Sequence, residues 1–160
     1  MASPELVHTW RRRSREASLA HYDSAHICQR NHVLLGIPTV ILSTVVGTSV
    51  FATLAKEATA ESKIIIGTLS VLAAIFAALQ TLLRFSERAE RHRLAGAEFS
   101  SLNKELELIL AYPPASPQEE SELLSELRKR WDDVIAHSPT CNQRALNRRR
   151  AESAAPLLGK

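Results

Sequence analysis

The sequence predicts an all-α membrane protein in which a two-helix transmembrane hairpin is joined to a cytoplasmic bundle of amphipathic helices. Two long stretches without a charged side chain, a short connector between them, and helical apolar periodicity on either side predict this class. The 160 residues suit one domain, and 45% hydrophobic residues, 23% charged residues and a net charge of +3 are ordinary values. The charges lie almost entirely outside the two stretches, so their distribution decides the class.

The first predicted element is a helix over residues 4–31. Ser3 is a favourable N-cap, and Pro4 suits the first helical position. No proline or glycine follows before Asn31, and small or apolar residues recur at three- to four-residue spacing on one face. Because this face is rich in small side chains, we expect it to pack closely against another helix. The face consists of Leu6, Trp10, Ala17, His21, Ser24 and Cys28.

Two uncharged stretches, residues 33–55 and 64–83, are long enough to cross a bilayer, and the second helix is expected to leave the membrane near residue 85. At about 1.5 Å per residue they span about 34 and 30 Å, which matches a hydrocarbon core of about 30 Å. The alternative is a buried hairpin of a soluble bundle, but such helices seldom run this long without a charge. A signal peptide is not expected, because the first stretch starts too late, is too long and lacks a small-residue cleavage site.

The connector, residues 56–63, is short, so the two transmembrane helices are expected to be antiparallel neighbours. Five Lys and Arg residues lie in the N-terminal flank, two in the connector and five in residues 84–104, which follow the second stretch. This excess predicts that both termini lie in the cytoplasm. Arg30, Arg84 and Arg88 fall at the inner membrane border, where long basic side chains can reach the headgroups.

The second transmembrane helix is expected to continue as a cytoplasmic helix to about residue 112, with Gly96 as its most favourable kink. Ser116 is the N-cap of a further helix over residues 117–137. Both segments have an apolar seam opposite a charged face, which predicts a small bundle beneath the membrane. These elements together form one domain over residues 1–138, followed by a basic, flexible tail over residues 139–160.

No catalytic or metal-binding constellation is found, so neither enzyme activity nor a cofactor is expected. The six histidines form no HxxxH or HExxH pattern, and neither Cys28 nor Cys141 has metal-ligand spacing with a histidine. Neither apolar stretch contains Asp, Glu or Lys, which argues against a proton relay or an ion-coupled transporter. No nucleic-acid partner is expected.

Small residues line one face of each transmembrane helix and are the remaining candidates for function. In a bilayer, a small face favours contact with protein, and a bulky face favours lipid. Two interpretations stay open, namely the simple seam of the hairpin or a hydroxyl-bearing pore lining shared between subunits. The pore requires a homo-oligomer, because two helices cannot enclose a lumen. The candidates are Gly36, Thr39, Ser43 and Gly47 on the first helix and Gly67, Ser70, Ala74, Ala77 and Thr81 on the second.

The exit of the second transmembrane helix, LQTLLRFSERAERHR at residues 79–93, resembles that of SLATT proteins. These are the two-transmembrane effectors associated with SMODS nucleotide synthetases and SLOG nucleotide-binding domains in bacteria. The sequence IPTVILSTVVGTSVF at residues 37–51 resembles the first transmembrane helix of the same family. Trp10 and residues 126–131 fit the same layout, so the resemblance covers about residues 8–137.

The resemblance implies a pore-forming or membrane-permeabilising effector of a bacterial anti-phage or related conflict system. It implies a multi-pass protein of the bacterial inner membrane, in contact with the lipid bilayer. A separate nucleotide-synthesising or nucleotide-sensing partner is expected to activate it, because no sensor domain is visible in these residues. The alternative is a non-conducting membrane anchor whose cytoplasmic bundle recruits a partner.

Overall fold

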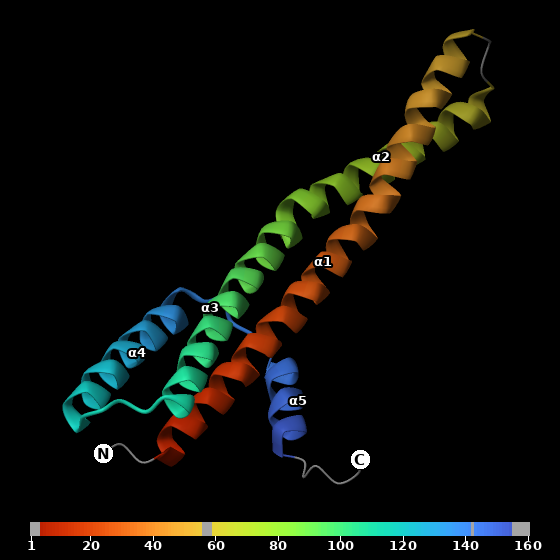
Figure 1. The fold of residues 1–160 in the computed structure, drawn as a ribbon. Coiled ribbons are helices and arrows are strands. Elements are labelled where there is room, and N and C mark those ends of the chain that lie inside the picture. Colours follow the sequence, from red (N-terminus) through yellow and green to blue (C-terminus); the bar gives the residue numbers. More distant parts are fainter. Residues whose placement is uncertain (1–3, 56–58, 142, 155–160) are drawn as a thin grey trace. The chain divides into compact units, whose positions relative to one another are not determined.

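The computed structural model describes residues 4–55, 59–141 and 143–154, and every regular element within these ranges is an α-helix (Figure 1). The all-α prediction is therefore confirmed. The chain divides into two compact units: a hairpin unit, residues 28–87, and a bundle unit, residues 1–27 together with 88–160. The helices are α1 (Pro4–Ala55), α2 (Ala60–Leu83), α3 (Phe85–Ala111), α4 (Pro117–His137) and α5 (Gln143–Ala154).

Helix α1 is continuous over two segments that the sequence predicts to be separate helices, residues 4–31 and 33–55. Between them the sequence has neither a glycine nor a proline to end the helix, and the backbone continues through His32. Pro38 also lies inside α1 without ending it. The change from a polar to an apolar sequence is thus a change of environment along one helix.

The opposite correction applies to the second long helix, which is divided at Arg84 rather than kinked at Gly96. Arg84 is the C-cap of α2 in the left-handed conformation, with φ 45° and ψ 42°, the one positive φ at a non-glycine position in the described residues. A residue with a Cβ adopts this left-handed conformation at a free-energy cost of about 1 kcal/mol. The Arg84 guanidinium lies 2.8 Å from Oε1 of Glu87, in the first turn of α3. The ion pair favours the break at a position where the sequence has no glycine cap.

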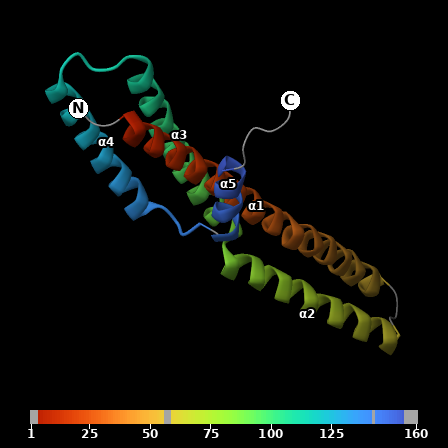
Figure 2. The same ribbon diagram turned by 90° about the horizontal axis from the view of Figure 1, so that it is seen from below.

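In the hairpin unit, α2 runs antiparallel beside the part of α1 that follows residue 28 (Figures 1 and 2). Buried and half-buried side chains alternate at three- and four-residue spacing on both helices, the pattern of a coiled-coil seam. Thr59 begins α2 by accepting a hydrogen bond from the Ser62 N–H. The seam contains Leu35, Thr39, Leu42, Val46 and Ser49 of α1 and Ile66, Leu69, Ala73, Phe76 and Gln80 of α2.

The bundle unit has its own apolar core, formed by α1, α3 and α4. Trp131 of α4 contacts Phe99 of α3 edge-on, with ring centroids 5.8 Å apart, and its ring centroid lies 6.4 Å from that of Trp10 in α1. Such aromatic contacts add to the burial of apolar area. The buried core residues are Val7, Phe99, Leu102, Leu106, Leu124 and Leu127.

Helices α1 and α3 approach closely through small residues, as expected, but the contacting Ser14 and Ser18 lie outside the predicted face, whose Leu6 is 41% exposed. The Ser14 hydroxyl donates to the Phe99 carbonyl at 2.6 Å, and the Ser18 hydroxyl donates to the Gly96 carbonyl at 2.8 Å. A Cβ on Gly96 would lie 3.3 Å from both the Ser18 carbonyl oxygen and the Tyr22 ring. Gly96 therefore permits close packing inside α3.

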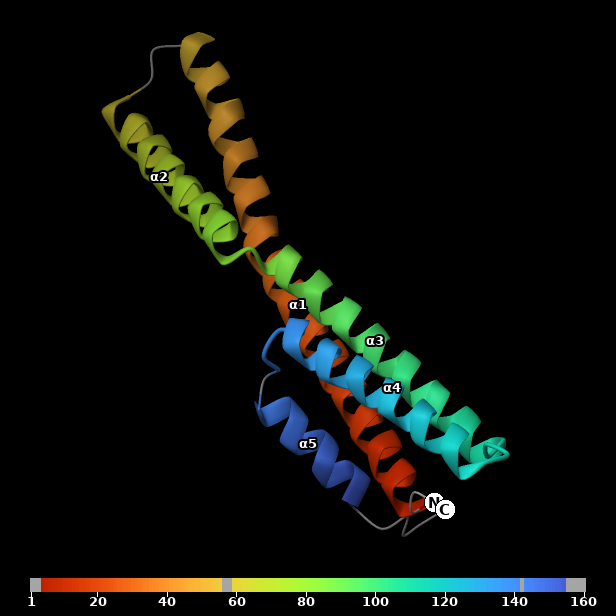
Figure 3. The same ribbon diagram turned by 90° about the vertical axis from the view of Figure 1, so that its left-hand side faces the viewer.

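Part of the segment that was expected to be a flexible tail, residues 139–160, is helix α5 beside α1 (Figure 3). Arg149 donates to both carboxylate oxygens of Asp23, and Arg148 donates to one of them at 2.7 Å. A two-pronged guanidinium–carboxylate pair is among the strongest polar contacts in proteins. Sequence reasoning missed it because the partners are 126 residues apart. Residues 155–160 lie outside the described part of the chain.

Candidate functional site

Two helical segments, within Glu5–Val50 and Ala60–Ala111, are long and apolar enough to cross a membrane. In the most apolar parts of these segments, only 0% and 6% of the residues are buried in the structure. A core helix of a soluble protein would instead be covered by its own chain. Large apolar side chains are strongly exposed, including Val40 at 66% and Leu82 at 75%. A surface of this kind requires lipid or another protein to cover it.

The small-residue candidates fall into two groups in the hairpin unit. Gly36, Thr39 and Ser70 are half-buried within the unit. The other six are exposed, and a Cβ on Gly47 or Gly67 would meet no atom of the described residues within 4 Å. Packing within the hairpin thus partly covers three of the nine candidates. The exposed group is Ser43, Gly47, Gly67, Ala74, Ala77 and Thr81.

Several hydroxyl groups along the hairpin donate hydrogen bonds within their own helices. The Thr39 hydroxyl donates to the Leu35 carbonyl at 2.7 Å, and the Thr81 hydroxyl donates to the Ala77 carbonyl at 3.0 Å. The same four-residue pattern occurs at Ser70. A hydroxyl bonded in this way tolerates an apolar environment and keeps its oxygen lone pairs for water or for a second chain.

One polar residue of the hairpin unit, Gln80, was not among the predicted candidates. An ideal Cβ on Gly36 would lie 3.3 Å from Nε2 of Gln80, so the glycine makes space for this amide in the seam. Burying an amide in hydrocarbon is unfavourable, and a small residue opposite it lets the amide approach the facing backbone. Only a charged residue in an apolar stretch stands out in the sequence, so the uncharged amide of Gln80 gave no signal.

The three arginines predicted at the inner membrane border are all exposed. Arg30 lies in α1, Arg84 is the left-handed C-cap of α2, and Arg88 lies in α3. Exposure leaves these long side chains able to reach lipid phosphates. Arg84 has the additional role of separating α2 from α3.

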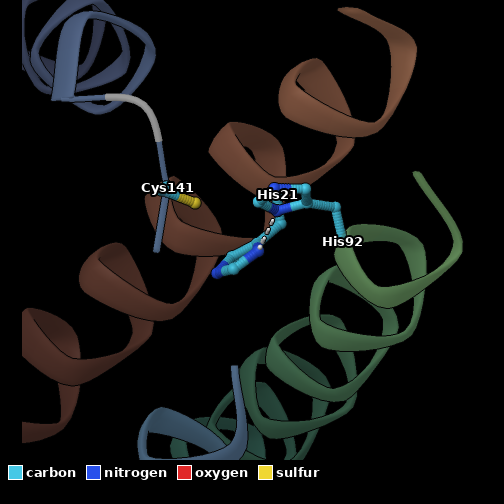
Figure 4. Close-up of side chains that lie close together, drawn as sticks. All are labelled: His21, His92 and Cys141. Atoms are coloured by element: carbon cyan, nitrogen blue, oxygen red, sulfur yellow. Dashed lines mark hydrogen bonds between the residues drawn. The ribbon is translucent and has the colours of Figure 1, made fainter. Parts of the chain in front are cut away.

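Two buried histidines meet in the bundle unit, His21 of α1 and His92 of α3, with their Nδ1 atoms 3.2 Å apart (Figure 4). Burial, together with the charge of His92, lowers the pKa of His21 to about 4, and burial also lowers the pKa of His92. Both rings are therefore neutral at neutral pH, and one Nδ1–H donates to the other Nδ1. His21 also stacks on Phe99 with centroids 5.5 Å apart. No sequence spacing could indicate this pair, because its members are 71 residues apart.

A basic cleft of about 480 Å³ lies in the same unit, lined by Arg12, Arg13 and Glu16 of α1 and Arg150 of α5. Arg12 and Glu16 approach to 3.9 Å, which leaves an excess of positive charge at the lining. The volume falls within the range of small-molecule sites, and guanidinium groups bind phosphate oxygens in pairs. The arginine run 148–150, expected to be a solvated tail, contributes one residue to this cleft and two to the ion pair with Asp23.

Comparison with known proteins identifies the family. No curated protein and no solved structure matches the sequence significantly. The family described as SMODS and SLOG-associating 2TM effector domain family 4 matches residues 17–154. The match runs past residue 137 to include α5, but it begins at residue 17 and so leaves out Trp10, which the resemblance had included. With both apolar helical segments and most of the bundle unit inside the match, the chain belongs to the SMODS and SLOG-associating two-transmembrane effector domain family.

Proposed function

We propose that this membrane effector permeabilises the bacterial inner membrane as a homo-oligomer assembled through the exposed small faces of α1 and α2. The observation that carries the proposal is the exposure of six small residues along the two apolar helices of the hairpin. Small faces allow helices of different chains to approach closely within a bilayer. In this arrangement both termini lie in the cytoplasm, following the distribution of Lys and Arg.

A pore requires several copies of the hairpin, because two helices leave no lumen between them. The oxygen lone pairs of hydroxyls such as Thr81, whose donor is already bonded within its helix, are suited to water in a pore. The large apolar side chains on the other faces, such as Ile64 at 69% exposure, suit the lipid side.

The basic cleft supports activation by an anionic signal. Arg12, Arg13 and Arg150 provide guanidinium groups from two helices around a volume of about 480 Å³, which suits a nucleotide phosphate. A nucleotide made or sensed by a partner protein would bind here and bias the membrane hairpin towards its conducting assembly. The same cleft supports the second candidate function, a non-conducting anchor that recruits an acidic partner.

The decisive experiment is dye release from liposomes that contain the purified protein, with and without added nucleotides. We expect release by the wild-type chain and strongly reduced release by Gly47→Leu and Gly67→Leu, whose new side chains would occupy the small face. Thr68→Leu is the matched control, because Thr68 is exposed and, at about 100° per residue, lies on a different face of α2 from the small residues. Equal release by both glycine variants and the control would contradict the proposed interface, and no release under any condition would favour the anchor.

A further inference from the structure

We propose that His21, His92 and Cys141 form a zinc-binding site that fastens the segment before α5 to helices α1 and α3. One donor atom of each residue lies within 4.8 Å of the others (Figure 4). The two histidines are buried, and Cys141 is half-buried in the segment between α4 and α5. All three belong to the bundle unit.

The spacing of the two imidazoles matches a shared metal ion. Zinc binds histidine nitrogen at about 2.0–2.1 Å, and a tetrahedral centre then places two nitrogen ligands about 3.3 Å apart. The Nδ1 atoms of His21 and His92 are 3.2 Å apart. The zinc ion would therefore replace the proton on the Nδ1 atom that now donates. That proton would move to Nε2 of the ring that carried it.

A small movement of Cys141 would bring its sulfur to the position of the third zinc ligand. With a Zn–S bond of about 2.3 Å, a tetrahedral centre needs about 3.6 Å between sulfur and each nitrogen. Cys141 lies outside the helices, in a connecting segment, so its backbone can move without breaking a helical hydrogen-bond ladder. Three protein ligands leave the fourth position for water.

The donor set also selects the class of metal. Two imidazole nitrogens and one thiolate favour zinc over magnesium or calcium, which prefer oxygen ligands. Burial keeps both histidines neutral, which is the form that binds a metal, because it lowers the pKa of each ring. Burial raises the pKa of the Cys141 thiol, so metal binding would release the thiol proton to solvent as the Zn–S bond forms.

The bound zinc ion would hold α5 in place against α1 and α3. Its three ligands join α1, α3 and the segment that leads into α5, and Asp23, two residues after His21, binds Arg148 and Arg149 of α5. The metal and the ion pair would thus hold the same helix at two points. Because α5 also provides Arg150 of the basic cleft, zinc binding would fix one wall of that cleft.

The test is a cobalt titration of the full-length, metal-stripped protein in detergent, followed by displacement with zinc. We expect one equivalent of Co²⁺ to bind with the visible bands of a tetrahedral centre and a near-ultraviolet thiolate-to-cobalt band. Cys141→Ser should remove the thiolate band, and His92→Gln should weaken affinity at least about a hundredfold. Cys28→Ser, the matched control at the chain's other cysteine, should bind as the wild type does.

Two results would overturn the proposal. One is a wild-type protein that shows no saturable binding of Co²⁺ or Zn²⁺. The other is a thiolate band that persists in Cys141→Ser or disappears in Cys28→Ser. Far-ultraviolet circular dichroism of each variant reports its helix content, and the wild-type titration decides the question even if His92→Gln fails to fold. The readout does not depend on membrane permeabilisation.

Discussion

The guanidinium of Arg149 holds both carboxylate oxygens of Asp23, with Nε at 2.9 Å from Oδ2 and Nη2 at 2.8 Å from Oδ1. Both side chains are mostly covered, with 26% and 20% exposed. The pair connects α5 to α1 at a point where the sequence predicts only a loose tail. Its presence gives α5 a defined place in the bundle unit.

Replacing Asp23 with Asn should loosen α5. The neutral amide cannot reproduce a charge-assisted, two-pronged contact, and Arg149 would keep a covered charge without its partner, a loss of about 1–3 kcal/mol. Hydrogen exchange should show faster exchange of the α5 amides and little change in α4. Asp132→Asn is the control, because the Arg128–Asp132 pair is 74% and 69% exposed and should have little effect. Unchanged protection of α5 in Asp23→Asn would disprove its anchoring role.

Acid should destabilise the metal-free bundle unit through His21. Below pH 6.5 the unfolded chain binds a proton at this histidine, whereas the folded chain binds it only near pH 4. The free energy of unfolding should therefore fall as the pH decreases from about 6.5 to 4, by at most about 3 kcal/mol. Urea unfolding with a chelator present, followed by the fluorescence of Trp10 and Trp131, measures this.

The control for the acid experiment is His137→Gln, since His137 is exposed at the end of α4. This variant should keep the full pH dependence, and His21→Gln should lose the part due to His21 and keep the part due to the lowered pKa of His92. A wild-type curve that is flat between pH 6.5 and 4 would contradict the assignment to His21.

A single methyl group at Gly96 should separate α1 from α3. Its Cβ would lie 3.3 Å from the Ser18 carbonyl oxygen, and a backbone atom cannot yield as a flexible side chain can. We expect Gly96→Ala to destabilise the bundle unit by about 1–3 kcal/mol in urea unfolding. Gly67→Ala is the matched control: its Cβ meets none of the described residues within 4 Å, so no loss is expected. Equal stability of the two variants would show that the α1–α3 contact is less close than described.

Membrane topology can be tested by cysteine labelling in intact cells. In a background without Cys28 and Cys141, Glu61→Cys at the start of α2 should react with an impermeant maleimide added outside. Glu122→Cys in α4 should react only after the cells are permeabilised. Both positions are exposed, so access to the reagent determines the result. The reverse labelling pattern would place the termini outside the cytoplasm.

The sequence was most informative where local chemistry determines structure. The two uncharged stretches identify the apolar helices without reference to any other part of the chain. The start of α4 follows from Ser116, whose hydroxyl accepts the Glu119 N–H at 3.2 Å, while the Glu119 carboxylate accepts the Ala115 N–H at 3.3 Å. This arrangement, in which the Glu119 carboxylate reaches the residue before the N-cap, is readable from five consecutive residues.

Features that depend on distant residues could not be predicted. The left-handed turn at Arg84 occurs without the glycine that normally indicates it. The His21–His92 pair and the Asp23–Arg149 pair join positions 71 and 126 residues apart, and only the packing of α1 against α3 and α5 brings them together. The sequence also did not determine which face of each transmembrane helix packs against the other helix, because small and bulky residues can both form a seam.

The contact between Gly36 and Gln80 has a consequence for how the hairpin can move. A slide of one helix past the other by a single position would bring the amide against Leu35 or Ile37 in place of the glycine. A lone polar side chain in an apolar seam commonly fixes the alignment of two helices in this way. The two helices would therefore move as one rigid body. Rearrangement between resting and active assemblies would then occur at the contacts between hairpins of different subunits.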